Sequence, residues 1–219
     1  MLTFTENPTM PRALVAFALL ALTASAVTSL AAQDRRGGRD RGLVELPAEG
    51  VRSGFFISGT VGAGAEQNKY SVETEYTQSL TKPTLGLRLG GTPNSSVRVG
   101  GEFFGWFNSV DGGTETFGAA LVMAQVYPVK TAGLYLKAGG GIAQAGTPPA
   151  DFIGPNITET GFGWSVGAGF DIALSPQVSV GPTVDFYKGT FTKRNEPTLS
   201  DRVLNIGVQL SFQTGGRRR

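Results

Sequence analysis

The period of the hydrophobic pattern is the feature that most constrains the fold of this chain. From Ser53 onward, apolar residues alternate with small or polar ones in eight runs. In Leu204–Phe212, for example, every second residue is Leu, Ile, Val or Phe. Successive residues of a strand point to opposite faces, whereas a helix cannot keep such alternation on one face. We therefore predict strands over Ser53–Ala65, Pro83–Gly91, Ser96–Phe107, Thr116–Tyr127, Ala132–Ala143, Phe162–Leu174, Val178–Tyr187 and Leu204–Phe212.

The connections between these runs alternate in length. Short, proline-bearing turns are predicted at Gly91–Ser95, Pro128–Thr131 and Ser175–Gln177. Longer polar loops are predicted at Glu66–Lys82, Asn108–Glu115, Gln144–Gly161 and Lys188–Asp201. In an up-and-down barrel this order collects the short turns at one end and the long loops at the other, as in transmembrane barrels. The sequence therefore predicts an all-β fold, an eight-stranded antiparallel up-and-down transmembrane β-barrel.

Each run has two sets of alternating residues: a bulky phase of large apolar residues and a second phase of small or polar ones. The composition of the second phase indicates which face of the barrel is outside. A soluble, lipocalin-like barrel would bury the bulky phase in its interior and expose the second phase to solvent. Here the other phase is mostly Gly, Ser, Thr and Ala, with few charges for a solvated exterior. We therefore expect the bulky phase to face lipid, including Phe117, Leu121, Met123 and Tyr127 in the fourth run. Aromatic residues near the strand ends indicate a girdle at the membrane interfaces, although core packing would account for any one of them taken alone. They are Phe55, Trp106, Phe107, Phe117, Tyr127, Phe162, Trp164, Phe186 and Tyr187.

Six charged residues share the phase expected to face the lumen. They are Arg88, Arg98 and Lys137, and Glu102, Asp171 and Asp185. Unpaired charges are costly away from water, so these residues should pair across neighbouring strands. Arg98 and Glu102 lie four residues apart on one strand and face the same way. We expect a balanced network that plugs a narrow lumen and leaves little or no ion conductance.

The N-terminal region predicts export. Ala13–Ala32 has no charged residue, follows Arg12 and precedes a polar, basic segment, the pattern of a secretory signal. Translation would start at Met1 or Met10, with cleavage after Ala31 or Ala32; the alternative is an uncleaved single-span anchor. The predicted organisation is signal peptide 1–32, polar basic linker 33–52, barrel 53–212 and basic tail 213–219.

Composition excludes several classes of site. The chain has no Cys and no His, so thiolate nucleophiles, Ser-His-Asp chemistry and two-His metal sites are excluded. From residue 43 to 216 there are 11 Lys and Arg against 14 Asp and Glu, a net charge of −3, so nucleic acid is not an expected partner. We expect no cofactor, no metal and no enzymatic activity. A carboxylate pair of Asp171 and Asp185 is the one acid–base alternative.

The export signal, the alternating runs, Gly163–Phe186 (GWSVGAGFDIALSPQVSVGPTVDF) and Arg202–Phe212 (RVLNIGVQLSF) resemble the bacterial outer-membrane β-barrel family of small eight-stranded, OmpA/OmpX-like proteins. The resemblance implies an outer-membrane location and contact with outer-membrane lipids. Members of this family usually end in an aromatic residue that the barrel assembly machinery reads, and Phe212 matches that position. Gln213–Arg219 follow it here, which departs from the family pattern.

Two functions remain open from the sequence. The first is a non-enzymatic barrel with a structural or surface-interaction role and a plugged lumen. The alternative is a small barrel that transports or binds small or apolar compounds. That alternative needs lumen glycines to leave free volume: Gly139, Gly141, Gly163, Gly167, Gly169 and Gly181. The same glycines would equally serve close packing in a small barrel.

Overall fold

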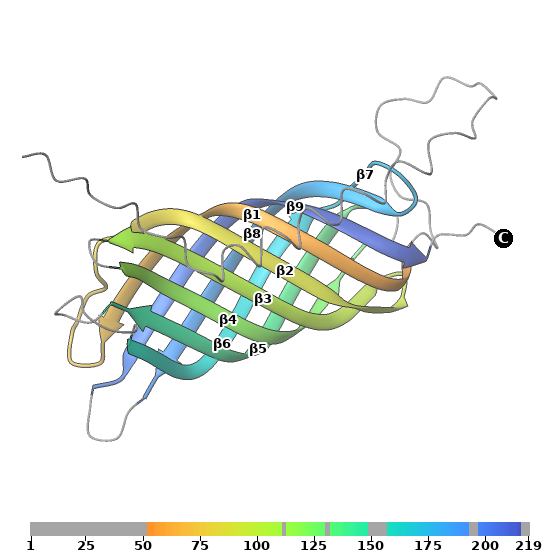
Figure 1. The fold of residues 1–219 in the computed structure, drawn as a ribbon. Coiled ribbons are helices and arrows are strands. Elements are labelled where there is room, and N and C mark those ends of the chain that lie inside the picture. Colours follow the sequence, from red (N-terminus) through yellow and green to blue (C-terminus); the bar gives the residue numbers. More distant parts are fainter. Residues whose placement is uncertain (1–51, 111–112, 130–131, 149–156, 193–196, 216–219) are drawn as a thin grey trace, which may run out of the picture. The chain divides into compact units, whose positions relative to one another are not determined.

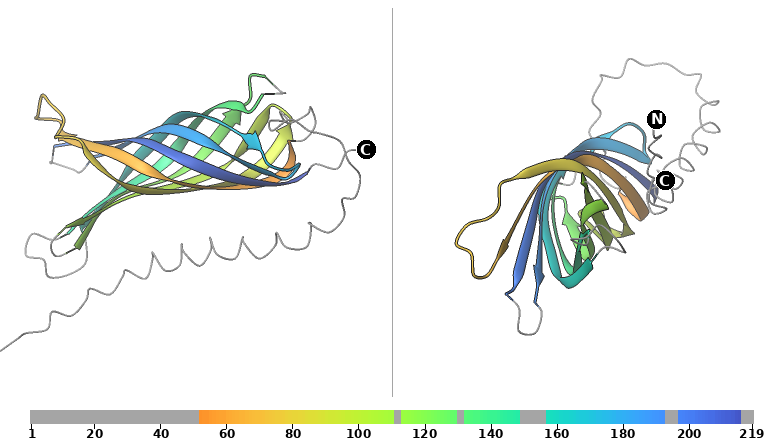
Figure 2. Two further views of the ribbon diagram at one scale, coloured as in Figure 1. Left: turned by 90° about the horizontal axis from the view of Figure 1, so that it is seen from above. Right: turned by 60° about the vertical axis from the view of Figure 1, so that its left-hand side comes forward.

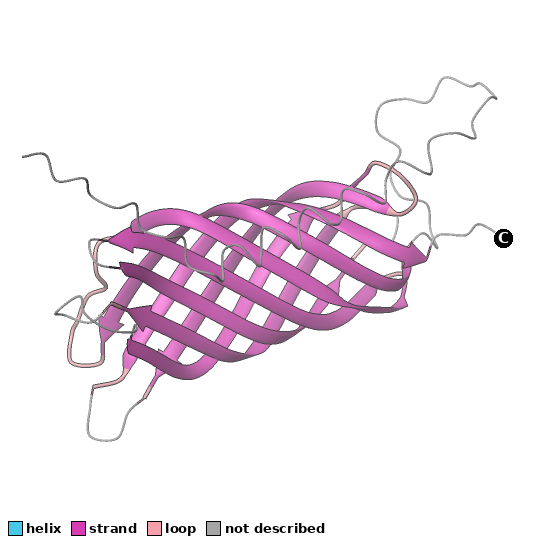
Figure 3. Ribbon diagram, viewed as in Figure 1, coloured by secondary structure: helices cyan, strands magenta, loops and turns pink. Residues whose placement is uncertain are grey.

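The computed structural model describes residues 52–110, 113–129, 132–148, 157–192 and 197–215 (Figure 1). The regular structure in these ranges is all β-sheet (Figure 3). Among the described residues, no helix is long and apolar enough to cross a membrane. The predicted signal segment, the linker up to residue 51 and tail residues 216–219 lie outside the described ranges.

Eight long strands and one short one form a single closed sheet within the described ranges (Figure 1). The long strands are β1 (Ser53–Tyr70), β2 (Leu80–Asn94), β3 (Val97–Val110), β4 (Gly113–Val126), β5 (Leu134–Thr147), β6 (Ile157–Phe170), β8 (Val178–Phe191) and β9 (Leu199–Gly215). The short strand β7 (Ile172–Ala173) pairs with β8. All pairings are antiparallel, and the β1–β9 and β6–β8 pairings close the barrel. The predicted eight-stranded antiparallel barrel is confirmed.

The barrel is apolar outside and polar inside. On its outer face, Val61 is 61% exposed, Ile206 61% and Val122 77%. On its inner face, Arg88 is 2% exposed and Glu102 1%. An outward apolar band and a polar interior are what a barrel in a bilayer requires, because hydrocarbon surrounds the outer face. Figure 2 shows the strongly tilted strands of the barrel from two further directions.

The fourth strand has the opposite phase from the one predicted. Phe117, Leu121, Met123 and Tyr127 are buried inside the barrel, while Val122 faces outward. Direct cross-strand partners share a face, and Leu121 is the partner of Glu102. Both phases of β4 are apolar, so the prediction rested on residue size alone and placed the bulkier residues on the wrong face.

The predicted aromatic girdle is also partly wrong. Trp106, Phe117, Tyr127 and Tyr187 are buried in the lumen. The remaining members of the set lie in the outward phase: Phe55, Phe107, Phe162, Trp164 and Phe186. Only these five residues can therefore contribute to an interfacial girdle, because the other four fill the interior.

Several strands extend further than predicted, and the loops are shorter. Most of the loop expected at Asn108–Glu115 is strand, because β3 runs to Val110, β4 begins at Gly113, and Asn108 pairs with Glu115. Backbone pairing does not need apolar side chains, so the sheet continues past the part that must face lipid. The alternation of loop lengths is correspondingly weaker than the sequence suggested. The predicted run Phe162–Leu174 is divided at Asp171, whose N–H donates to the carbonyl of Gly133 (2.9 Å).

Candidate functional site

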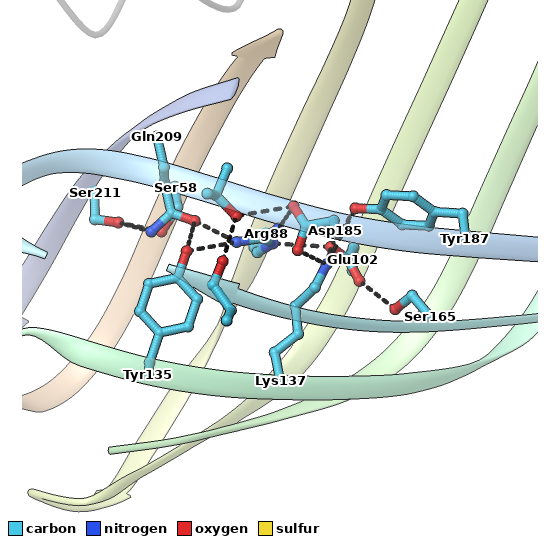
Figure 4. Close-up of polar contacts among 12 residues, drawn as sticks. Ser58, Arg88, Glu102, Tyr135, Lys137, Ser165, Asp185, Tyr187, Gln209 and Ser211 are labelled. Atoms are coloured by element: carbon cyan, nitrogen blue, oxygen red, sulfur yellow. Dashed lines mark hydrogen bonds and ion pairs between the residues drawn. The ribbon is translucent and has the colours of Figure 1, made fainter. Parts of the chain in front are cut away.

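The centre of the lumen holds four charged side chains, which we call the central network: Arg88, Glu102, Lys137 and Asp185 (Figure 4). They come from β2, β3, β5 and β8 and are at most 4% exposed. Arg88 Nε lies 2.8 Å from Glu102 Oε1, and Arg88 Nη2 lies 2.7 Å from Asp185 Oδ2. Lys137 Nζ pairs with Glu102 and lies 3.0 Å from Asp185 Oδ1. Arg88 and Glu102 lie on the neighbouring strands β2 and β3, whereas the other pairs join strands that are not neighbours, so the network crosses the lumen.

Neutral side chains complete the hydrogen bonding of the central network. Tyr187 and Ser165 donate to the two carboxylate oxygens of Glu102, over 2.8 Å and 3.1 Å. Thr183 donates to Asp185 Oδ2 over 2.9 Å. Arg88 also donates to Gln209 and, over 3.3 Å, to the hydroxyl of Tyr135 (Figure 4). These neutral groups add hydrogen bonds to the ion pairs, while Asp185 Oδ1 has only its ion-pair contact with Lys137.

Charge balance makes the central network compatible with burial. Two cations face two carboxylates, so its formal net charge is zero. A buried ion pair roughly breaks even against desolvation, but a buried charge that loses its partner is strongly unfavourable. The network is therefore a closed unit whose members depend on one another.

A second polar group, which we call the end cluster, lies toward the chain ends of the barrel: Arg98, Tyr127, Asp171 and Gln213. Arg98 Nη1 lies 3.4 Å from Asp171 Oδ2, and Tyr127 donates to the same oxygen over 2.7 Å. Arg98 Nη2 donates to Gln213 over 2.9 Å. Gln209 joins the end cluster to the central network, because its Oε1 accepts from Arg88 and its Nε2 donates to Asp171 (3.4 Å).

Toward the opposite end, the lumen is filled by what we call the aromatic layer: Phe104, Trp106, Phe117, Tyr187 and Phe191. The rings of Phe104 and Tyr187 stack with centroids 3.7 Å apart, and Phe117 meets Phe104 edge-on at 6.3 Å. Trp106 Nε1 donates to the carbonyl of Gly64 over 2.9 Å. Tyr187 contributes its ring to this layer and its hydroxyl to the central network. Apolar and ionic groups thus occupy successive levels of the same lumen.

The six charged residues identified in the sequence divide into two groups. Arg88, Glu102, Lys137 and Asp185 come together in the central network, and Arg98 pairs with Asp171 in the end cluster. The expectation of pairing across neighbouring strands holds only for Arg88 and Glu102, which are direct partners of β2 and β3. The other pairs reach across the lumen. Arg98 and Glu102, although on one strand, have different partners.

The two aspartates of the acid–base alternative do not act as a pair here. Asp171 is held by Arg98 and Tyr127, and Asp185 by Arg88 and Lys137. The two carboxylates are thus paired with different cations. In the described ranges, no group of three or more acidic residues is arranged to hold a metal ion.

The lumen glycines are close-packed positions. A Cβ at Gly167 would overlap the carboxylate of Asp185, and one at Gly169 would overlap the Tyr135 ring and hydroxyl. At Gly163 an added Cβ would lie 2.9 Å from the Cβ of Ala143. A cavity beside Arg52, Arg98 and Asp171 has a volume of about 20 Å³, room for about one water molecule. The glycines therefore make space for neighbouring side chains.

At the end of the barrel beyond the aromatic layer, Glu66 and Asp201 are buried together. The outward residues at this level are polar, Gln67 and Arg202, so this pair lies beyond the apolar band. Burial, followed by the negative charge of Glu66 and a hydrogen bond to it, raises the pKa of Asp201 to about 9. Burial also raises the pKa of Glu66. Asp201 is therefore protonated at neutral pH beside its neighbour.

Several residues of the lumen were missed in the sequence: Phe104, Tyr135, Ser165, Thr183, Phe191, Gln209 and Gln213. All of them share the phase of the charged residues, and that phase was the available signal. Phe212, proposed as an assembly signal, lies in β9 opposite Ile57 of β1 and Val178 of β8 and is 40% exposed. The strand continues past it to Gly215.

The chain is similar to several solved structures. Neisserial surface protein A is 16% identical, with a TM-score of 0.51 over 72% of this chain and 97% of its own. The N-terminal barrel of Pseudomonas aeruginosa OprF is 13% identical, with a TM-score of 0.41 over 70% and 97%. Yersinia pestis Ail, the attachment invasion locus protein, is 14% identical, with a TM-score of 0.40 over 74% and 99%. No curated protein sequence matches the chain.

At such identities, the likeness to neisserial surface protein A shows a common fold alone. The family assignment comes from the sequence model of the outer membrane protein β-barrel domain, which matches residues 17–212. This match covers most of the chain and includes all eight long strands up to Phe212. The chain belongs to the outer membrane protein β-barrel domain family.

Proposed function

We propose that this protein is a non-enzymatic outer-membrane barrel with a structural or surface-interaction role and a closed lumen. The observation that carries the proposal is the central network, which joins β2, β3, β5 and β8 across the lumen through buried ion pairs. The aromatic layer lies over it and adds a second, apolar barrier. A solute would have to separate both before it could pass.

Transport or capture of small or apolar compounds is the other function considered. It required free volume at the lumen glycines, and side chains or backbone occupy that volume. The packing therefore favours the closed barrel over the transporter.

The proposal includes a route to the membrane. We propose that residues 1–32 are removed on export, that the barrel assembly machinery reads Phe212, and that outer-membrane lipids surround the apolar band. Ser53 and Gly215 are register partners, so both ends of the described barrel emerge on one side, which we assign to the periplasm. N-terminal sequencing of the membrane-extracted protein should begin at Ala32 or Gln33; an intact 13–32 segment would refute cleavage.

Solute uptake tests the proposed function. Proteoliposomes of the purified protein should swell no faster in arabinose or glycine than protein-free liposomes, and a porin reconstituted in parallel provides the positive control. Rapid swelling with folded protein, shown by its heat-modifiable migration on a gel, would favour transport and overturn the closed-lumen proposal.

A further inference from the structure

Three cations lie on the outer face of the barrel, beyond the apolar band at the end opposite the two chain ends. We call them the basic patch: Lys69 of β1, Lys188 of β8 and Arg202 of β9. Lys188 is the next outward residue after Phe186, and Arg202 is the one before Leu204. All three are half-buried, and within the described part of the chain none of them has a salt bridge.

The pairing within the basic patch is unfavourable for the protein alone. Lys188 and Arg202 are direct cross-strand partners on the same face. Like charges placed opposite each other destabilise a sheet. An anion between the two side chains would reverse that effect, because both cations would then face a negative charge.

The arginine of the basic patch is held in place. Its guanidinium carbon lies 3.6 Å from the centroid of the Tyr76 ring, and Lys69 Nζ lies 5.1 Å from the same ring. Arg202 Nη2 also donates to Gln67 over 2.9 Å, and Gln67 donates to the carbonyl of Thr77. The link between β1 and β2 therefore orients two of the cations, which reduces the entropy lost when an anion binds.

Aromatic residues place the basic patch at the membrane surface. Trp164 is the cross-strand partner of Lys188, and its ring lies 5.5 Å from that of Phe186. Aromatic side chains of this kind mark the interface between hydrocarbon and headgroups. The cations next to them on the loop side therefore lie at the level of the headgroups.

We propose that the basic patch binds the phosphate-bearing headgroup of a lipid in the leaflet on the loop side of the barrel. The acyl chains of the same molecule would then lie along the apolar band at Leu204, which is exposed, and Phe186, which is half-buried, each the next outward residue below a cation. This continuity of charged and apolar surface selects a lipid over free phosphate.

Tryptophan quenching tests the proposal directly. The chain has two tryptophans, Trp164 beside the patch and Trp106 inside the lumen. The protein is reconstituted in vesicles of brominated phosphatidylcholine, whose bromine atoms quench tryptophan fluorescence. Increasing amounts of lipid A, a phosphorylated glycolipid without bromine, are then included in the vesicles. Lipid A bound at the basic patch displaces the brominated lipid from Trp164, so the fluorescence of Trp164 rises. The W164F variant measures the constant fluorescence of Trp106, which is subtracted.

We expect lipid A to be preferred over phosphatidylcholine by about tenfold at Trp164, and K188Q to reduce the preference roughly fivefold. K188Q/R202Q should abolish it. K82Q, which removes the same charge from the inward phase of β2, should leave it unchanged. A native chain without preference, or a preference kept by folded K188Q/R202Q, would overturn the proposal. So would loss of the preference in 10 mM inorganic phosphate at constant ionic strength, which would indicate a free-phosphate site.

Discussion

Replacement of Glu102 by Ala should be among the most destabilising single changes in this barrel. The carboxylate accepts from Arg88, Lys137, Tyr187 and Ser165, and its loss leaves two buried cations facing only Asp185. Removing one partner of a buried ion pair typically costs about 3–5 kcal/mol. We expect a loss of that size in the free energy of unfolding, measured by urea titration in lipid vesicles with the gel shift of the folded band as readout.

A double-mutant cycle separates the charge effect from the cavity that E102A creates. E102Q preserves the shape of the side chain, K137M removes one cation, and E102Q/K137M restores the balance of charge with Arg88 and Asp185. Each single variant should be less stable than the native protein, and the double variant should be more stable than the sum of the two losses predicts, by about 1–3 kcal/mol. Additive losses, or an E102A barrel within about 0.5 kcal/mol of the native one, would refute the reasoning.

Two further predictions concern packing and pH. G167A should destabilise the barrel by about 1–3 kcal/mol, because a Cβ there would displace the carboxylate of Asp185. The control variant G59A should change stability little, because no atom lies within 4 Å of the added Cβ. Equal losses of stability for the two variants in urea titrations would contradict the packing account. The pKa of Asp201 is raised from 3.8 to about 9 by burial beside Glu66, so the contribution of Asp201 to the free energy of unfolding should be fully present below about pH 4 and fall as the pH rises toward 9. D201N should remove much of this fall in the temperature of gel-shift unfolding between pH 5 and 8.5, and an unchanged pH dependence in D201N would refute it.

The fold could be predicted because lipid imposes a simple pattern. The outward band must be apolar at every second residue, so seven of the eight runs were assigned to the correct face from their alternation. The pairing of Arg88 with Glu102 could also have been found, since a hairpin turning near Ser95 places these two residues opposite each other. The strand ends could not be found in this way, because beyond the bilayer the sheet continues through polar residues such as Asn108 and Glu115.

The cross-lumen contacts were beyond sequence reasoning for a different reason. Lys137 meets Glu102 and Asp185 only because a closed barrel brings β3, β5 and β8 around one lumen. Barrel closure, strand tilt and register together determine which side chains meet in the lumen. The alternation of residues within one strand carries no information about closure, tilt or register. The inward phase of β4 was missed because neither of its phases is polar, so only its register against Glu102 defines the buried side.

Single-channel recording of the unmodified protein in planar bilayers tests the closed lumen most directly. The account predicts a steady baseline without conductance steps, from protein whose folded state is confirmed by heat-modifiable migration, because the central network and the aromatic layer both fill the lumen. Large, long-lived conductance steps from the same folded preparation would contradict it and show a continuous water path through the barrel.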